Sequence, residues 1–313
     1  MRLRVSKISR IAQDVVTVDL VDPAGLPLPT WEPGSHLELV LPSSLIRHYS
    51  LCGPLDKHAL YRVAVLRVRD GRGGSQEIHD SVSEGSEVVV RGPRNHFELV
   101  PAPAYLLLAG GIGVTPLYSM AQALADRGAD WQMIYGARDE ASMSFREELS
   151  ALGSDHVTFM DESISGRPDF AQMLDQAPVG AAVYCCGPEP MIRHVEGVFA
   201  GLRPDLTLHI ERFGGGDIAV IQEGDGAFDI ELALSGVTLH VPADRTALDV
   251  VREYVPDHPY SCLEGQCGSC EVAVLAGQID HRDEVLSVEE KEENSAMMLC
   301  SSRAISAKIV INL

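Results

Sequence analysis

The spacing of four cysteines near the end of the chain constrains this protein more than any other feature of its sequence. Cys262, Cys267 and Cys270 form a C-x4-C-x2-C pattern, and Cys300 follows after 29 intervening residues. This is the plant-type spacing for a [2Fe–2S] cluster, in which one tight loop supplies three thiolates. Coincidence and a structural zinc site are the alternatives, although structural zinc usually uses two C-x2-4-C pairs. The pattern predicts a [2Fe–2S] centre.

Composition bounds the class of protein and its surroundings. A chain of 313 residues, 45% of them hydrophobic and 22% charged, is typical of a globular protein with two or three domains. Its net charge of −20 argues against nucleic acid and anionic membranes as partners. The N-terminal stretch lacks the apolar run of a signal peptide, and clustered cysteines suit metal binding in a reducing compartment. We therefore expect a cytoplasmic protein.

Hydrophobic periodicity changes along the chain and predicts three domains. Residues 1–100 contain about six short β-rich runs with no good helix between them, which predicts an antiparallel β-barrel. Residues 101–213 alternate buried strands with helical segments, which predicts an α/β domain with a parallel sheet. Residues 214–226 are rich in glycine and acidic residues and are predicted to be a linker. Residues 227–313 combine a hairpin, one helix, the cysteine loop and a final strand, which predicts an α+β domain.

A glycine-containing turn predicts a dinucleotide site in the α/β domain. It follows the strand residues LLLA and contains Gly110, Gly111 and Gly113, with Thr115 as the expected N-cap and Pro116 as the first helical residue. Glycines at such a turn let the backbone approach a pyrophosphate, whose charge suits the helix N-terminus. Alone the motif is weak, because proline replaces the third glycine of the G-x-G-x-x-G pattern.

A second turn strengthens this prediction. Cys186, Gly187 and Pro188 follow a later buried strand, so they are expected at the sheet edge where open α/β sheets bind ligands. Two such turns favour a dinucleotide crevice over a purely structural role. Arg138 and Asp139 follow the neighbouring strand, near the expected place of an adenosine ribose. The acid weakly favours NADH over NADPH, and a solvated loop explains both residues equally well.

The barrel holds candidates for a flavin site. Consecutive polar residues occupy a strand where alternation predicts fewer of them: Arg47, His48, Tyr49 and Ser50. Arginine suits a phosphate, tyrosine can lie along an aromatic ring, and a serine hydroxyl can bond a ring nitrogen. A GRGGS turn is expected to add a backbone nest for a phosphate: Gly73, Gly74 and Ser75. Taken singly, each feature is more often an ordinary strand or turn.

Taken together, these motifs resemble those of the ferredoxin–NADP reductase superfamily, and the whole chain resembles the phthalate dioxygenase reductase family. RGPRNHFEL (91–99) and ERF (211–213) resemble further family segments. The resemblance implies a β-grasp ferredoxin domain at the C-terminus, and FMN rather than FAD. It also implies that the strand at 47–50 and the GRGGS turn hold the FMN, with Ser50 at flavin N5. Finally, it implies that Phe213 covers a flavin face and that Cys186 lies near the nicotinamide ring.

These expectations combine into an electron path. A nicotinamide gives up two electrons as a hydride, a [2Fe–2S] cluster accepts one, and a flavin does both, so the path runs from NADH through FMN to the cluster. The resemblance implies a terminal Rieske-type oxygenase as the acceptor. The acidic C-terminal domain predicts docking on a basic patch of that partner. A cytochrome P450 acceptor and a non-catalytic flavin and iron–sulfur redox sensor are the alternatives.

Overall fold

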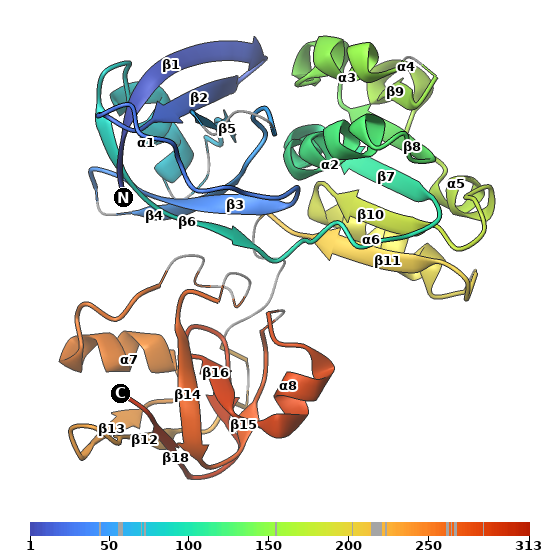
Figure 1. The fold of residues 1–313 in the computed structure, drawn as a ribbon. Coiled ribbons are helices and arrows are strands. Elements are labelled where there is room, and N and C mark those ends of the chain that lie inside the picture. Colours follow the sequence, from blue (N-terminus) through green and yellow to red (C-terminus); the bar gives the residue numbers. More distant parts are fainter. Residues whose placement is uncertain are drawn as a thin grey trace. The chain divides into compact units, whose positions relative to one another are not determined.

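The computed structural model divides into two compact units, Met1–Phe213 and Gly214–Leu313 (Figure 1). It describes residues 1–43, 45–55, 59–69, 71, 73–153, 155–201, 203–213, 221–222, 224–260, 263, 265, 268–283 and 285–313. Two of the predicted cluster ligands, Cys262 and Cys267, lie outside these described residues. No helix within the described ranges is both long and apolar enough to cross a bilayer.

The first unit begins with an antiparallel sheet of six strands. They are β1 (Arg2–Ala12), β2 (Val15–Val21), β3 (Ser35–Val40), β4 (Ile46–Ser50), β5 (Tyr61–Leu66) and β6 (Glu87–Asn95). Their order is β4-β3-β6-β1-β2-β5, and every neighbouring pair is antiparallel. A bridge between Leu51 and Val63 links the residue after β4 to β5, so the two edges of the sheet meet as in a barrel. Alternate residues such as Leu37, Leu39 and Val63 fill its interior.

A helix interrupts this barrel where none was expected. α1 (Gly74–Ser81) lies between β5 and β6, so the prediction of strands without a helix was wrong. The segment reads as a polar turn because its only strongly apolar residue is Ile78, which is buried in the barrel core. One apolar residue in two turns gives too little periodicity to reveal a helix.

A parallel sheet of five strands follows, in the order β11-β10-β7-β8-β9. The strands are β7 (Tyr105–Gly110), β8 (Trp131–Ala137), β9 (Val157–Asp161), β10 (Ala182–Cys186) and β11 (Thr207–Glu211). The connections are η1 (Gly111–Gly113), α2 (Val114–Asp126), η2 (Glu140–Ser142), α3 (Arg146–Leu152), α4 (Glu162–Ser165), α5 (Phe170–Asp175) and α6 (Glu189–Phe199). Leu107 of β7 packs with α2, whereas Leu106 and Leu108 pack in a separate core with α5 and α6. The sheet is therefore covered on both faces, as predicted.

The barrel and the parallel sheet share a core. Val15, Cys52 and Ala64 of the barrel region belong to the same buried cluster as Leu117 and Tyr118 of α2. This continuous core explains why the two sheets form one unit, and it holds the barrel against the face of the parallel sheet that α2 covers.

The second unit is a mixed sheet with a helix packed against it, the β-grasp arrangement that was predicted. Its strands are β12 (Phe228–Leu232), β13 (Val237–Val241), β14 (Glu271–Ala276), β16 (Ala296–Met298) and β18 (Lys308–Ile311), with a separate pair β15 (Ile279–Asp280) and β17 (Arg303–Ala304). Its helices are α7 (Ala247–Tyr254) and α8 (Val288–Glu293). β12 and β18 are parallel and the other pairs antiparallel. Leu248 and Val251 of α7 complete the core.

Candidate active site

The two predicted nicotinamide segments lie together at the carboxyl edge of the parallel sheet. β7 and β10 are neighbours, so the turns that follow them are adjacent. A Cβ on Gly110 would lie 2.7 Å from Pro188 Cδ and 3.2 Å from Gly187 Cα, and a Cβ on Gly187 would lie 3.1 Å from Gly110 Cα. Gly113 approaches the backbone of Cys186 as closely. Only glycine permits this contact, which leaves two strand–helix turns side by side at the ligand-binding edge.

The helix after the first turn begins earlier than predicted. η1 runs directly into α2, whose N-cap is Gly113, so the assignment of Thr115 as N-cap and Pro116 as first helical residue was wrong. Both residues lie in the first turn of the helix. The buried Thr115 hydroxyl donates to Ile112 O at 3.0 Å instead of capping the helix. Pro116 is tolerated there because first-turn N–H groups have no partner within the helix.

Cys186 faces a carboxylate that the sequence did not single out. Glu211 is its partner across β10 and β11, at the same edge of the sheet. Burial raises the pKa of the Cys186 thiol well above its usual value, and the neighbouring Glu211 and Cys185 add to this effect. Burial raises the pKa of Glu211 to about 8, and its Oε2 has no hydrogen-bond partner among the described residues. The position of an acid at the carboxyl end of a strand was the available signal for Glu211.

An arginine holds the segment that carries Glu211 and Phe213. Arg212 Nε donates to Glu189 Oε2 at 3.1 Å, and its Nη2 donates to Glu196 Oε2 at 2.8 Å. Both acceptors lie on α6, the helix that follows the second glycine turn. Phe213 is 45% exposed. Arg212 thereby ties the end of β11 to the second nicotinamide segment.

Arg138 and Asp139 follow β8, next to β7 in the sheet. Arg138 is exposed. The Asp139 carboxylate accepts hydrogen bonds from Ser142 N at 2.9 Å and from Ser142 Oγ at 2.7 Å, so it caps η2. Asp139 has a local structural role beside the ribose contact that was predicted.

Arg47 and the GRGGS turn are brought together in the barrel. A Cβ on Gly74 would lie 2.5 Å from Arg47 Nε and 2.7 Å from its Cγ. Gly73, in a left-handed conformation (φ 81°), precedes α1 and offers no side-chain cap. The Ser75 hydroxyl accepts from Val68 N at 3.0 Å, which fixes the turn. A guanidinium beside uncapped backbone N–H groups fits a phosphate.

The rest of the predicted flavin strand presents one apolar and one polar face. Tyr49 packs on the barrel core, and burial raises its pKa above its usual value. On the other face, Ser50 is 5% exposed and pairs with His36 across β3 and β4. His48 lies beside His36, with ring centroids 5.0 Å apart, and neither Nε2 has a hydrogen-bond partner among the described residues. Such orphaned buried nitrogens fit a polar ring system bound there.

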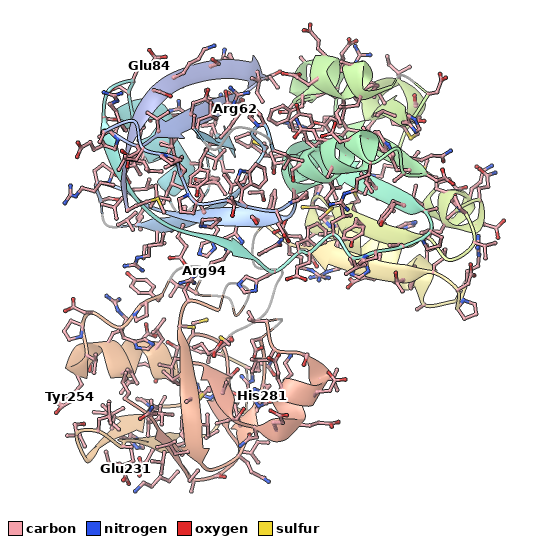
Figure 2. All side chains as sticks on the ribbon, in the orientation of Figure 1. Arg62, Glu84, Arg94, Glu231, Tyr254 and His281 are labelled. Carbon is pink, nitrogen blue, oxygen red and sulfur yellow. The ribbon has the colours of Figure 1, made fainter. Side chains whose placement is uncertain are left out.

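His36 was missed from sequence, and its surroundings keep it neutral. Burial and the neighbouring His48 and His96 lower its pKa to about 3. Glu38, two residues along β3 and 1% exposed, pairs with Arg94 at 2.8 Å; Arg94 is labelled in Figure 2. Polar and charged side chains on this face of β3 and β4 are therefore buried, although such side chains are usually exposed to solvent.

Two predicted cluster ligands lie together in the second unit. Cys270 and Cys300 are each 2% exposed and form no disulfide. Gly265 N donates to Cys300 Sγ at 3.2 Å, and Cys300 N donates to Cys270 Sγ at 3.4 Å. Gly265 and Gly268 both have φ of 71°, which lets the loop turn its amides toward sulfur. Buried sulfurs that accept backbone N–H groups fit thiolate ligands of a cluster.

No group of three His, Cys, Asp or Glu side chains suited to a metal occurs within the described part of the chain. The predicted set is incomplete there because Cys262 and Cys267 fall outside it.

Comparisons with known proteins agree with this arrangement. Residues 230–304 match the family model "2Fe-2S iron-sulfur cluster binding domain", and residues 93–202 match "Dimethylamine monooxygenase subunit DmmA-like, N-terminal domain". The chain is 39% identical to the phenoxybenzoate dioxygenase subunit beta of Ectopseudomonas oleovorans, covering 99% of this chain and 97% of that protein. It is 37% identical to the phthalate dioxygenase reductase of Burkholderia cepacia, covering 100% and 97%.

Solved structures give the same result. A phthalate dioxygenase reductase structure, described as a modular structure for electron transfer from pyridine nucleotides to [2Fe–2S], aligns with a TM-score of 0.73 and 36% identity over 100% of this chain and 98% of that one. A type IV self-sufficient cytochrome P450 monooxygenase aligns with a TM-score of 0.89 and 38% identity. All of this chain is covered in that match, but only 41% of the P450 chain, about two-fifths of its length.

Fold and site define a flavin and iron–sulfur oxidoreductase with a nicotinamide crevice. The chain belongs to the phthalate dioxygenase reductase family. As a member, it is an NADH-dependent enzyme that uses FMN and a [2Fe–2S] cluster, and it is the reductase component of an oxygenase system. The predicted family, fold class, enzyme class and cofactors are confirmed.

Proposed function

We propose that this chain collects electrons from NADH at the edge formed by the two glycine turns and delivers them to a Rieske-type oxygenase. The close approach of Gly110 to Gly187 carries this proposal, because it brings the two strand–helix turns together at the ends of β7 and β10. When bound, NADH supplies a hydride, FMN converts it to single electrons and the cluster relays them.

The chain's own residues bind and orient these groups. Arg138 and the first turn (Gly110, Gly111, Gly113, Thr115 and Pro116) hold the dinucleotide together with Gly187 and Pro188. Cys186 and Glu211 lie beside the nicotinamide, where the buried carboxyl of Glu211, with its pKa of about 8, stays protonated near neutral pH. Arg212 keeps Phe213 in place to cover the flavin face.

We assign the flavin to the strand at 47–50 and the turn before α1. Arg47 and the N–H groups after Gly73 bind the phosphate, with Gly74 and Ser75 shaping the turn. His48 contributes its unpartnered Nε2 and Ser50 donates to N5, while Tyr49 supports the strand from the barrel core.

Replacing Arg47 tests this assignment. Arg47→Lys loses the planar fork that binds phosphate, so we expect FMN to dissociate about tenfold more readily, equivalent to about 1.4 kcal/mol. Arg67→Lys is the matched control, because Arg67 pairs with the exposed Asp80 at 2.8 Å. Equal FMN affinity in both variants, measured by fluorescence of released flavin, would overturn the assignment.

We place the four cluster ligands at Cys262, Cys267, Cys270 and Cys300. We also propose domain boundaries at 1–100 for the FMN barrel, 101–213 for the NAD domain, 214–226 for the linker and 227–313 for the ferredoxin domain. The buried free thiols of Cys52, Cys185 and Cys186 suit a cytoplasmic location, where thiols stay reduced.

The second part of the proposal concerns the protein that accepts electrons from the cluster. Residues 227–313 carry 6 basic against 15 acidic side chains, which favours docking on a basic patch of the oxygenase. A cytochrome P450 is the second candidate, because the match with a self-sufficient P450 covers this whole chain.

Electron transfer to purified acceptors tests the choice between them. The NADH-reduced enzyme should reduce a Rieske-type oxygenase faster than a bacterial P450, and the rate should fall steeply as salt increases. Faster reduction of the P450 would contradict the proposed acceptor, and a salt-independent rate would contradict the docking surface. Absence of turnover with any acceptor would favour a redox sensor.

A further inference from the structure

Asp283 is a buried carboxylate on the segment between β15 and α8 of the second unit. The residue is 3% exposed. Its Oδ2 accepts hydrogen bonds from Leu286 N at 2.9 Å and Val285 N at 3.3 Å, and its Oδ1 accepts from Ser302 Oγ at 3.2 Å. The carboxylate therefore connects its own turn to the chain segment that immediately follows Cys300.

The same residue packs against Gly265. A Cβ on Gly265 would lie 3.0 Å from Asp283 Cα and 2.9 Å from Ser301 Cβ, so Gly265 lies directly against both residues. Gly265 N in turn donates to Cys300 Sγ at 3.2 Å. A displacement of Asp283 would therefore shift the Cys300 sulfur in two ways. Ser302 lies two residues after Cys300 in the chain, and Gly265 N donates to the sulfur itself.

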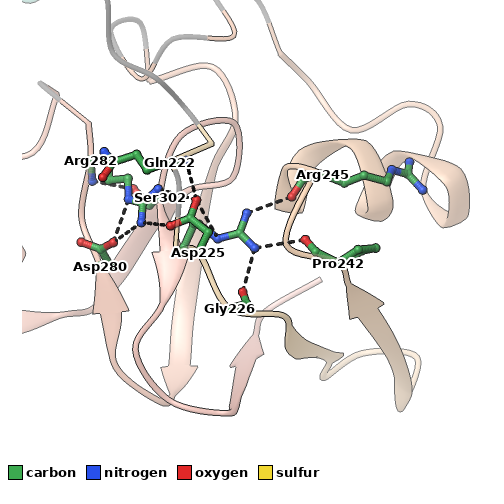
Figure 3. A network of polar contacts seen from close by, with 9 residues as sticks. Gln222, Asp225, Gly226, Pro242, Arg245, Asp280, Arg282 and Ser302 are labelled. Atoms are coloured by element: carbon green, nitrogen blue, oxygen red, sulfur yellow. Dashed lines mark hydrogen bonds and ion pairs between the residues drawn. The ribbon is translucent and has the colours of Figure 1, made fainter.

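A polar network anchors this support to the rest of the unit (Figure 3). Ser302 Oγ accepts from Arg282 N at 3.2 Å, and the Arg282 guanidinium forms a bidentate pair with Asp225 at 2.6 and 2.9 Å. Arg303 is also buried and donates to three backbone carbonyls: Arg245 O, Gly226 O and Pro242 O. The residues after Cys300 are therefore held on both sides.

Two cationic or ionisable groups face the carboxylate. Lys291 Nζ lies 3.8 Å from Asp283 Oδ2 and donates to Asp283 O, while His281 Nδ1 lies 3.7 Å from Oδ1. His281, labelled in Figure 2, has no hydrogen-bond partner for either ring nitrogen among the described residues. Asp283 is therefore a buried carboxylate that faces one lysine and one histidine.

We propose that Asp283 is a positioning residue for the [2Fe–2S] cluster. Through Ser302 and the Gly265 loop it fixes the Cys300 sulfur, and its negative charge lowers the reduction potential of the cluster. A nearby anion disfavours the added electron, and groups around the ligands tune potentials in this way. This inference rests on the ligand set proposed above.

Two variants separate the geometric from the electrostatic part. Asp283→Asn keeps an oxygen for the backbone N–H groups but removes the charge, whereas Asp283→Ala removes both. Asp229→Asn is the matched control, because Asp229 contacts His240 at 2.8 Å, its side chain is 45% exposed, and neither residue belongs to this network. The measurements are the midpoint potential of the cluster by spectroelectrochemistry and the electron paramagnetic resonance (EPR) spectrum of the reduced enzyme.

Asp283→Asn should keep the rhombic signal and shift the cluster's one-electron equilibrium about tenfold toward the reduced form, or 59 mV. Asp283→Ala should broaden the signal and lower cluster content, and Asp229→Asn should resemble wild type. If the wild type shows the signal and Asp283→Asn has an unchanged potential, or one shifted no more than in Asp229→Asn, this inference is overturned while the ligand set stands. A wild type without the signal would overturn both.

Discussion

The proposed nicotinamide site and the proposed cluster site are built by opposite means. At the nicotinamide site, the two turns meet because neither Gly110 nor Gly187 carries a Cβ. At the cluster site, the thiols of Cys270 and Cys300 are the functional groups, and backbone N–H groups donate to them. We therefore expect the nicotinamide site to lose function when a methyl group is added to a glycine, and the cluster site to lose function when a thiol is removed.

Removal of a cluster ligand should give the largest effect. Cys300→Ser should abolish the [2Fe–2S] EPR signal and reduction of one-electron acceptors such as cytochrome c, while NADH still bleaches the flavin at a rate within about twofold of wild type. Cys185→Ala is the control, since Cys185 lies in the apolar core of the parallel sheet. A full cluster signal in Cys300→Ser would contradict the assignment of Cys300 as a cluster ligand.

Addition of one methyl group should damage the proposed nicotinamide site. Gly187→Ala places a Cβ 3.1 Å from Gly110 Cα, an overpacking that costs about 1–3 kcal/mol, so KM for NADH should rise by up to roughly 5- to 150-fold. Gly197→Ala in α6 is the matched control, because no described atom lies within 4 Å of its new Cβ. That control should be neutral or stabilise the protein by up to about 1 kcal/mol. Normal kinetics in Gly187→Ala would refute the close-approach account.

The buried carboxyl beside Cys186 predicts a pH dependence. The pKa of Glu211 is raised to about 8 in the folded chain, so between pH 4.5 and 8 the unfolded chain loses this proton while the folded chain keeps it. Stability relative to Glu211→Gln should therefore fall as pH rises through this window, by up to about 5 kcal/mol. Urea unfolding of both proteins at pH 5 and 8.5 measures the difference. Parallel stability curves would show that Glu211 titrates normally.

The smallest effect should come from replacing Arg212, which holds the segment that carries Phe213. Arg212→Lys keeps the charge but cannot reach Glu189 and Glu196 together, so flavin reduction should slow about two- to fivefold with a stability loss of about 1 kcal/mol. Arg203→Lys, at an ion pair with Asp205 elsewhere in the first unit, should leave the rate unchanged. Equal stopped-flow rates of flavin reduction in the two variants would contradict the proposed role of Arg212 in positioning Phe213.

Patterns of backbone and ligand spacing could be predicted from the sequence. The parallel sheet, the glycine turns and the cysteine spacing each follow from a local periodicity or interval that survives folding. The start of α2 could not be predicted, because η1 extends the helix backward from Thr115 to Gly113. Helix α1 was missed because only Ile78 marks its buried side.

Tertiary surroundings were beyond the sequence. Burial in the folded chain raises the pKa of Glu211 and, together with His48 and His96, lowers the pKa of His36. Asp283 reads as one acid among many in an acidic segment, and only the folded unit brings it to Ser302. The supporting residues of a site depend on long-range contacts, whereas its ligands often leave a local motif.

The electron path is tested most directly by anaerobic titration of the purified protein with NADH, followed by absorbance and EPR. The account predicts bleaching of a flavin band together with a rhombic signal from a reduced [2Fe–2S] centre. Bleaching without that signal would contradict the cluster at the four cysteines, and no response to NADH would contradict the path as a whole.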